Sequence, residues 1–253
     1  MRNLVKLTLA SCIAASTFGA QAAVISFANS GFESGDLTGW NTIGTVVATP
    51  STTVTTFDST VWSIFAADTT MAQLNSSGVD VGTIESTLGL TAGALNALNT
   101  NPDGGSLTNG SALYQSFSGN AGDTFSFAWN YVATDYIPFN DPAFAVLIGD
   151  SGADITVLAS IHGLGAAVGT SGNSGWQTFG ATLSATGNYT LAVITTNDKD
   201  TILSSVLHID NTAGTCDPDC PPINPGAVPE PASLALLGIG MAGLVAMRRR
   251  KTA

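Results

Sequence analysis

The sequence predicts a mostly β protein whose central part is a two-sheet antiparallel β-sandwich, jelly-roll-like, with a short helical insertion near residues 83–98. Segments with strand-like alternation recur along the chain, and turn residues separate them. About ten such segments within roughly 190 residues are typical of a two-sheet sandwich. No period of about 20–50 residues repeats, which excludes a solenoid or a propeller. A hydrophobic content of 44% argues against a disordered chain.

The clearest predicted strand is Asp123–Tyr131, in which four aromatic residues alternate with other residues: Phe125, Phe127, Trp129 and Tyr131. Successive side chains of a strand point to opposite faces, so these aromatics share one face and should face a core. The other predicted strands are Val24–Phe27, Trp40–Ala48, Val61–Ala66, Ala112–Ser118, Ala143–Gly149, Ile155–Ile161, Trp176–Leu183, Asn188–Thr195 and Val206–Asp210.

The segment Thr83–Asn96 breaks the strand pattern. Its apolar residues lie near helical spacing and two glycines interrupt them: Ile84, Leu88, Leu95 and Leu98, with Gly89 and Gly93. This pattern predicts one or two short helices inserted between strands.

The two ends of the chain carry predicted targeting signals. Arg2 and Lys6 precede an apolar stretch, and Ala20-Gln21-Ala22 is an A-x-A cleavage site, so residues 1–22 are predicted to be a secretory signal peptide. A competing lipoprotein signal would cut before Cys12. Residues 23–213 then form the sandwich ectodomain, 214–228 a Pro-rich linker with a cysteine pair, and 229–253 a sorting signal.

The exported part is strongly acidic. The segment from Ala23 to Pro231 contains all 18 acidic residues of the chain but only one basic residue, Lys199, which gives it a net charge of −17. Such a surface repels phosphate backbones, which argues against nucleic-acid binding, and it favours cations.

The linker contains Cys216 and Cys220. In an oxidising compartment, a small-loop disulfide between them is the favoured state. Zinc would need further ligands at suitable spacing, and no histidine lies nearby.

The last residues of the chain combine three parts. Pro229-Glu230-Pro231 should stay extended because both prolines suppress helix. The charge-free run Ala232–Met247 can form a transmembrane helix of about 24 Å. The basic residues that follow should hold the C-terminus in the cytoplasm: Arg248, Arg249, Arg250 and Lys251.

This tail resembles the PEP-CTERM signal of bacterial proteins that exosortase processes. In that family a membrane-embedded cysteine transpeptidase reads the Pro-Glu-Pro motif, which Pro229, Glu230 and Pro231 match position for position. The alternative is an ordinary C-terminal membrane anchor with an incidental Pro-Glu-Pro.

The ectodomain has resemblances of its own. Residues Asn29–Trp40 are similar to the opening of carbohydrate-binding-module-like, galactose-binding-like jelly rolls, and His208–Asn211 resembles their closing strand. Other stretches resemble a family of PEP-CTERM surface proteins with no assigned activity: Ile84–Leu98, Asn109–Phe117, Gly122–Trp129, Asn140–Phe144, Gly175–Phe179 and Ser205–Asn211. The second family implies export and surface display.

A structural calcium ion is implied by the first of these resemblances. Glu33 and Asp210 match the positions near the first and last strands that commonly hold it, and Asp36 lies nearby. The alternative is that Glu33 caps a turn and Asp210 bonds backbone N–H groups. A second acidic group, Asp135 with Asn140, Asp141, Asp198 and Asp200, is expected to consist of solvated loop residues.

A glycan site would need exposed aromatic residues on a concave face or loop rim. Trp62 and Tyr136 are the leading candidates, with Phe139 and Trp176 behind them, and packing in the core is the alternative for each.

Hydrolase chemistry has weak support. The sequence lacks H-E-x-x-H and G-x-S-x-G motifs. Alternation places His208 and Asp210 on one strand face, but no nucleophile is placed beside them, so His208 is expected to be a surface histidine.

Together these patterns predict a non-catalytic protein with no certain cofactor, exported through the translocon, trimmed by signal peptidase and anchored transiently in the inner membrane. Exosortase would then deliver it to the cell surface or extracellular matrix, in association with exopolysaccharide. A glycan-binding module and a secreted hydrolase are the alternatives.

Overall fold

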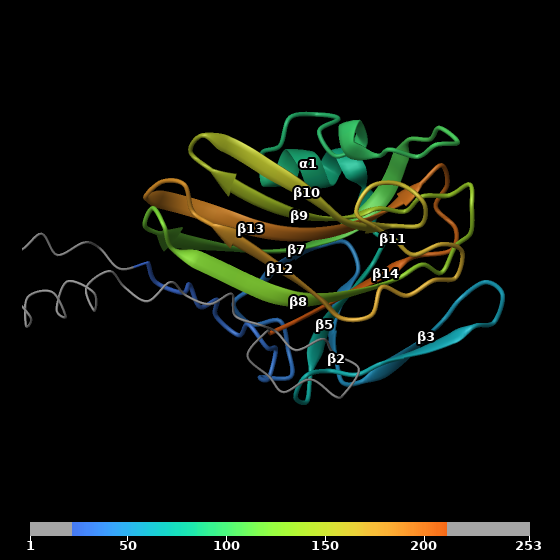
Figure 1. The fold of residues 1–253 in the computed structure, drawn as a ribbon, viewed down its shortest axis with the longest axis horizontal. Helices are drawn as coiled ribbons and strands as arrows, with labels where there is room; N and C mark the ends of the chain where they lie inside the picture. The colour runs from blue at the N-terminus through green and yellow to red at the C-terminus, as the bar shows by residue number, and fades with distance from the viewer. Residues whose placement is uncertain (1–21, 212–253) are drawn as a thin grey trace, which may run out of the picture. The chain divides into compact units, whose positions relative to one another are not determined.

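Two β-sheets packed face to face form the centre of the molecule in the computed structural model, which describes residues 22–211 (Figure 1). One sheet has seven strands, in the order β1 (Asn41–Ile43), β7 (Leu107–Gly119), β13 (Gly187–Asp198), β9 (Ala143–Gly149), β10 (Gly152–Ser160) and β11 (Ala166–Ala167), with β6 (Val79–Asp80) also paired to β7. We call it the helix-covered sheet. The other has five strands, in the order β12 (Gln177–Thr182), β8 (Thr124–Val132), β14 (Val206–Asp210), β5 (Met71–Asn75) and β2 (Val46–Thr49). We call it the hairpin-covered sheet.

The core between the sheets contains the aromatic face predicted from the sequence. Phe125, Phe127, Trp129 and Tyr131 of β8 are buried together with Leu191 and other apolar residues of the helix-covered sheet. The prediction of a mostly β, two-sheet sandwich is therefore confirmed. All pairings between its named strands are antiparallel except β10 with β11.

A short helix covers the outer face of the helix-covered sheet. Helix α1 (Val81–Leu88) begins at Asp80, whose carboxylate accepts a hydrogen bond from the Gly82 N–H at 2.8 Å. It ends at Gly89, which has a left-handed φ of 70°. Ile84 and Leu88 pack against the sheet. The predicted helical insertion is confirmed, although Gly89 stops α1 early and a separate 3₁₀ helix spans Asn96–Leu98.

A two-stranded hairpin, β3 (Thr52–Thr55) with β4 (Val61–Ile64), covers the outer face of the hairpin-covered sheet. Val54 and Ile64 of the hairpin are buried against Val132 and Val206 of the sheet. Two tryptophan N–H groups fasten the hairpin to residues 171–176: Trp62 donates to the Ser171 carbonyl at 2.8 Å, and Trp176 donates to the Phe65 carbonyl at 3.0 Å.

Some strand predictions need correction. The predicted strand Trp40–Ala48 is divided into β1 and β2, because Gly44 adopts a φ of 76° between them. The predicted strand Val24–Phe27 is reduced to a single parallel bridge between Val24 and Thr124. Strands β3 and β5 were not expected from the sequence.

The predicted signal peptide, linker, cysteine pair, sorting motif and transmembrane helix lie outside the described residues. Within residues 22–211, no helix combines the length and apolar character needed to cross a membrane.

Candidate functional site

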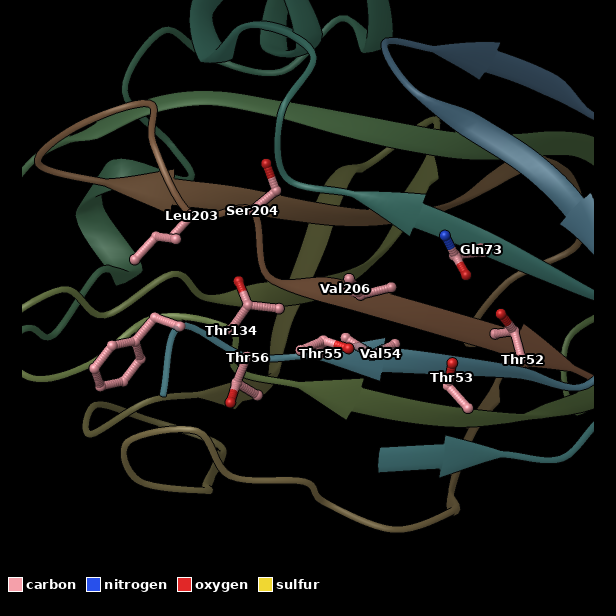
Figure 2. A pocket seen from close by; sticks show the side chains of 11 residues that line it. Thr52, Thr53, Val54, Thr55, Thr56, Gln73, Thr134, Leu203, Ser204 and Val206 are labelled. Atoms are coloured by element: carbon pink, nitrogen blue, oxygen red, sulfur yellow. The ribbon is translucent and has the colours of Figure 1, made fainter. Parts of the chain in front are cut away.

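A cleft lies between the hairpin and the sheet that it covers (Figure 2). Its volume is about 380 Å³, within the usual range for small-molecule sites. The consecutive residues Thr52 to Phe57 form one wall. The other wall is formed by residues from three separate segments: Gln73, Thr134, and Leu203, Ser204 and Val206. We call this the hairpin cleft.

The hairpin cleft exists because β3 is an edge strand. Within the described residues, β3 pairs with β4 on one side and with no strand on the other. A free strand edge presents backbone N–H and C=O groups that can bind a partner. Because six consecutive residues line the cleft, it is bordered by backbone as well as by side chains.

The lining of the hairpin cleft is polar but uncharged. Its polar side chains are hydroxyls and one amide, and no residue that lines it is ionisable. Thr134 is only 7% exposed, and its buried hydroxyl has no hydrogen-bond partner. An unpaired buried hydroxyl is costly, and this one belongs to a residue that lines the cleft.

Beneath the cleft, the sheet carries further polar residues. His208 is fully buried, and its Nε2 lies 3.2 Å from the Oε1 of Gln73, which lines the cleft. Burial lowers the pKa of His208 to about 3, so the imidazole is neutral. The Nδ1 of His208 and the Oδ1 of Asn130 lack partners. The expectation that His208 is a surface histidine is wrong, because the hairpin covers this face of the sheet.

Exposed aromatic residues lie at one end of the hairpin cleft. Phe57, which lines the cleft, is 43% exposed, and its ring lies 4.7 Å from that of Tyr136, which is 38% exposed. Phe139 packs edge-on against Tyr136 at 5.3 Å. The Phe57 N–H donates to the Thr134 carbonyl at 3.1 Å, which fixes this group of rings to the cleft. We call Phe57, Tyr136 and Phe139 the aromatic rim.

The two aromatic residues chosen from the sequence have different surroundings. Tyr136 belongs to the aromatic rim, where a ligand could reach it. Trp62 is partly buried among the apolar residues that join the hairpin to the sheet, so its packing gives it a structural role. Phe57 was missed, since a lone phenylalanine before Asp58-Ser59 carries no sequence signal beyond a turn.

The predicted calcium residues converge on one loop. Glu33 accepts hydrogen bonds from the backbone N–H groups of Thr69 and Thr70, and Asp210 accepts one from Ala67 at 2.8 Å. Burial raises the pKa of Asp210 to about 7, and the charges of Glu33 and Asp68 add to the effect. Asp36 instead bonds its neighbours Ser34 and Thr38.

This carboxylate pair fits a cation only in part. Two carboxylates approach the same loop, but backbone N–H groups already bind oxygens of both. In the part of the chain from 22 to 211, no group of three or more His, Cys, Asp or Glu side chains could hold a metal ion. The calcium site at Glu33 and Asp210 stays a prediction.

The second acidic group is buried, contrary to expectation. Asp135, Asp141 and Asp198 are each at most 2% exposed. Asp198 accepts hydrogen bonds from the side-chain amides of Asn99 and Asn101. Burial raises the pKa of Asp141 well above its usual range and that of Asp135 to about 6. Neutral amides and hydroxyls, rather than solvent, therefore satisfy these carboxyl groups.

Comparison with known protein families identifies the C-terminal tail. Residues 227–251 match the family model described as the PEP-CTERM protein-sorting motif. The chain therefore carries a sorting signal, which implies processing by exosortase and an exported protein that is sorted to the cell surface. The sequence motif Pro229, Glu230 and Pro231 lies within this match.

Comparisons with whole proteins and with solved structures gave different results. No curated protein matches the chain. Among solved structures, it is similar to TmCBM61, a carbohydrate-binding module determined in complex with beta-1,4-galactotriose. The two are 13% identical, the match covers 72% of this chain and 92% of that chain, and the TM-score is 0.33. At this distance the likeness carries no information about a ligand.

Proposed function

We propose that this chain is a non-catalytic cell-surface or extracellular-matrix protein that exosortase sorts through its C-terminal tail. The observation that carries the proposal is the match of residues 227–251 to the PEP-CTERM motif. The signal peptide would bring the ectodomain through the translocon, and signal peptidase would release its N-terminus. The tail would then hold it in the inner membrane until exosortase acts, and exopolysaccharide would be its final surroundings.

The test follows both ends of the protein in a bacterium that has exosortase. Intact-mass measurement of the chain from membrane, envelope and medium should find it shortened at both ends. Replacing Pro229 and Pro231 together with alanine should leave the C-terminal tail attached and the protein in the inner membrane. Pro225→Ala, in the linker, is the matched control and should be processed normally. Equal processing of all three chains, or normal processing in a strain without exosortase, would contradict the proposal.

The burial of His208 supports a non-catalytic ectodomain. A general base must reach its substrate and exchange protons near neutral pH. His208 is covered by the hairpin, and its pKa is lowered to about 3. The hydrolase alternative would require His208→Ala to abolish an activity of the secreted protein towards polysaccharide or peptide substrates.

The hairpin cleft favours one second function, the binding of a neutral glycan. Sugar hydroxyls pair with hydroxyl, amide and backbone groups, and the apolar faces of sugar rings pack on aromatic side chains. The cleft supplies the first kind of group and the aromatic rim supplies the second. The net charge of −17 disfavours acidic polysaccharides, so a neutral exopolysaccharide is the expected ligand.

Titration calorimetry with neutral oligosaccharides from the host's exopolysaccharide tests this second function. Phe57→Ala and Tyr136→Ala should each weaken binding by about tenfold or more, because each removes a stacking surface. Phe65→Ala is the matched control, since Phe65 is 47% exposed but does not line the cleft. A loss no larger than that of Phe65→Ala, or no binding by the unaltered protein, would leave display without glycan binding as the function.

A further inference from the structure

The residue at the predicted signal-peptide cleavage site lies against a carboxylate. Cleavage after Ala20-Gln21-Ala22 would make Ala23 the first residue of the exported chain. In the structure the backbone nitrogen of Ala23 donates to Oδ1 of Asp123 at 2.8 Å. The atom that would become the α-amino group is therefore already within hydrogen-bond distance of a negatively charged oxygen.

Further backbone bonds fix this position. The Thr124 N–H donates to the Ala23 carbonyl at 2.9 Å, and the Ile25 N–H donates to the Thr124 carbonyl at 2.7 Å. Ile25 packs against the core between the two sheets. The chain is thus attached to the start of β8 from its first predicted mature residue onwards.

Asp123 is held in place from the other side. It lies in the turn between β7 and β8, where its Oδ2 accepts a hydrogen bond from the Asn120 N–H at 2.8 Å. The hydrogen bonds from Ala23 and Asn120 keep the pKa of Asp123 below its usual range, so it is ionised at neutral pH. No cationic side chain is recorded against it in residues 22–211, where Lys199 is the sole Lys or Arg and donates to the Asp103 carbonyl.

We propose that Asp123 is the binding site for the α-ammonium group that signal peptidase creates on Ala23, so that removal of the leader completes the fold with an ion pair. Hydrolysis of the Ala22–Ala23 peptide bond consumes one water, leaves a carboxylate on Ala22 and gives Ala23 an amine that is protonated near neutral pH. A hydrogen bond between two charged groups is about twice as strong as one between neutral groups. The inference rests on the export part of the proposed function.

The consequence is a difference in stability between the trimmed and untrimmed protein. Before cleavage, Ala23 offers Asp123 a neutral amide N–H. After cleavage it offers a charged donor in an ectodomain with a large excess of negative charge. Leader removal therefore adds stability to the folded domain as well as releasing it.

The experiment compares two chains in the same detergent, one from Ala23 to Ala253 and one from Ala20 to Ala253, each released from a cleavable fusion. At pH 6 the chain that begins at Ala23 should melt about 2–4 °C higher, a shift of the size expected for one such interaction in a domain of this length. The Asp123→Asn variant should melt at the same temperature in both lengths. Equal melting of the two unaltered chains, or a difference that persists in Asp123→Asn, would overturn the proposal.

Two further measurements keep the test sharp if Asp123→Asn fails to fold. Acetylating Ala23 keeps its N–H but removes its charge, so the acetylated chain should melt with the longer one. The advantage of the shorter chain should also vanish near pH 10, because a raised amine pKa adds stability only below that pKa. A normal advantage after acetylation would overturn the inference.

The cleavage site itself is read from the exported protein. N-terminal sequencing should begin at Ala23, and a start at Cys12 or Val24 would overturn the inference. A failure of exosortase sorting would instead appear at the C-terminus, so the two failures can be distinguished.

Discussion

The two outer faces of the sandwich are covered in different ways. Helix α1 and the segment after it seal one face with apolar side chains such as Ile84 and Leu95, which are fully buried together with Phe144 of β9. The β3–β4 hairpin covers the other face but leaves polar groups such as His208 and Asn130 beneath it, some of them unpaired, and a cleft along its edge. The first cover serves folding, while the second leaves room for a ligand.

The largest loss of stability is expected from a mutation in the face that α1 covers. Ile84→Ala removes a fully buried side chain of α1 and should lower the free energy of unfolding by about 4 kcal/mol in chemical denaturation. Val54→Ala, the matching truncation in the hairpin, should cost about half as much, since fewer methyl groups are lost. Hydrogen exchange should show the Ile84 effect throughout both sheets and the Val54 effect mainly in residues 50–66. Global loosening by Val54→Ala would show that the hairpin is part of the main core.

The next largest effect is a loss of stability at acidic pH, caused by the buried His208. The unfolded chain protonates His208 near its ordinary pKa of 6.5, whereas the folded chain resists protonation until about pH 3. Stability is therefore lost as the pH falls through this window, by about 3 kcal/mol between pH 7 and pH 4. Because His208→Gln cannot take up this proton, denaturation curves should show a smaller loss for the variant. Parallel pH profiles would mean that water or a ligand solvates the imidazole.

Asp210 should show the opposite pH dependence. Its pKa is raised from 3.8 to about 7 in the folded state, so its contribution is fully present below about pH 4 and is lost as the pH rises through 7. Asp210→Asn should therefore gain stability relative to the unaltered protein between pH 5 and pH 8, by about 2 kcal/mol. A constant difference between Asp210→Asn and the unaltered protein would refute the raised pKa.

The smallest expected effect is that of calcium. A structural ion held by Glu33 and Asp210 would stabilise the domain by mass action, so a chelator should lower the melting temperature by a few degrees. Added calcium should restore it, and magnesium should do so less well. An unchanged melting temperature would contradict the calcium site. Glu33 and Asp210 would then act only as acceptors of backbone hydrogen bonds.

Where side-chain alternation was strong, the sequence was a good guide. Strands β9 and β14 have the predicted bounds, and the aromatic face of β8 is buried as expected. Strand β5 was missed because Met71–Asn75 lacks β-branched residues, and its conformation depends on pairing with β2 and β14. The threonine run of β3 has strand propensity but no apolar alternation to announce it.

The candidate site was harder to predict, because its parts come from distant segments. Nothing in the sequence joins Thr52–Phe57 to Thr134 or Ser204, which meet only after the hairpin folds over the sheet. The same reason explains the buried acidic group: Asp135, Asp141 and Asp198 each resemble solvated loop residues until Asn99, Asn101 and Ser205 are placed beside them.

The position of β14 has a mechanical consequence. It is the last described strand, and it lies between β8 and β5, hydrogen-bonded on both sides. The residues that lead to the C-terminal sorting tail continue directly from its end at Asp210 and Asn211. A force that pulls on that tail would act along β14 and would have to shear two rows of hydrogen bonds at once. The domain would therefore resist such a force through a central strand of the sheet, not through an edge strand.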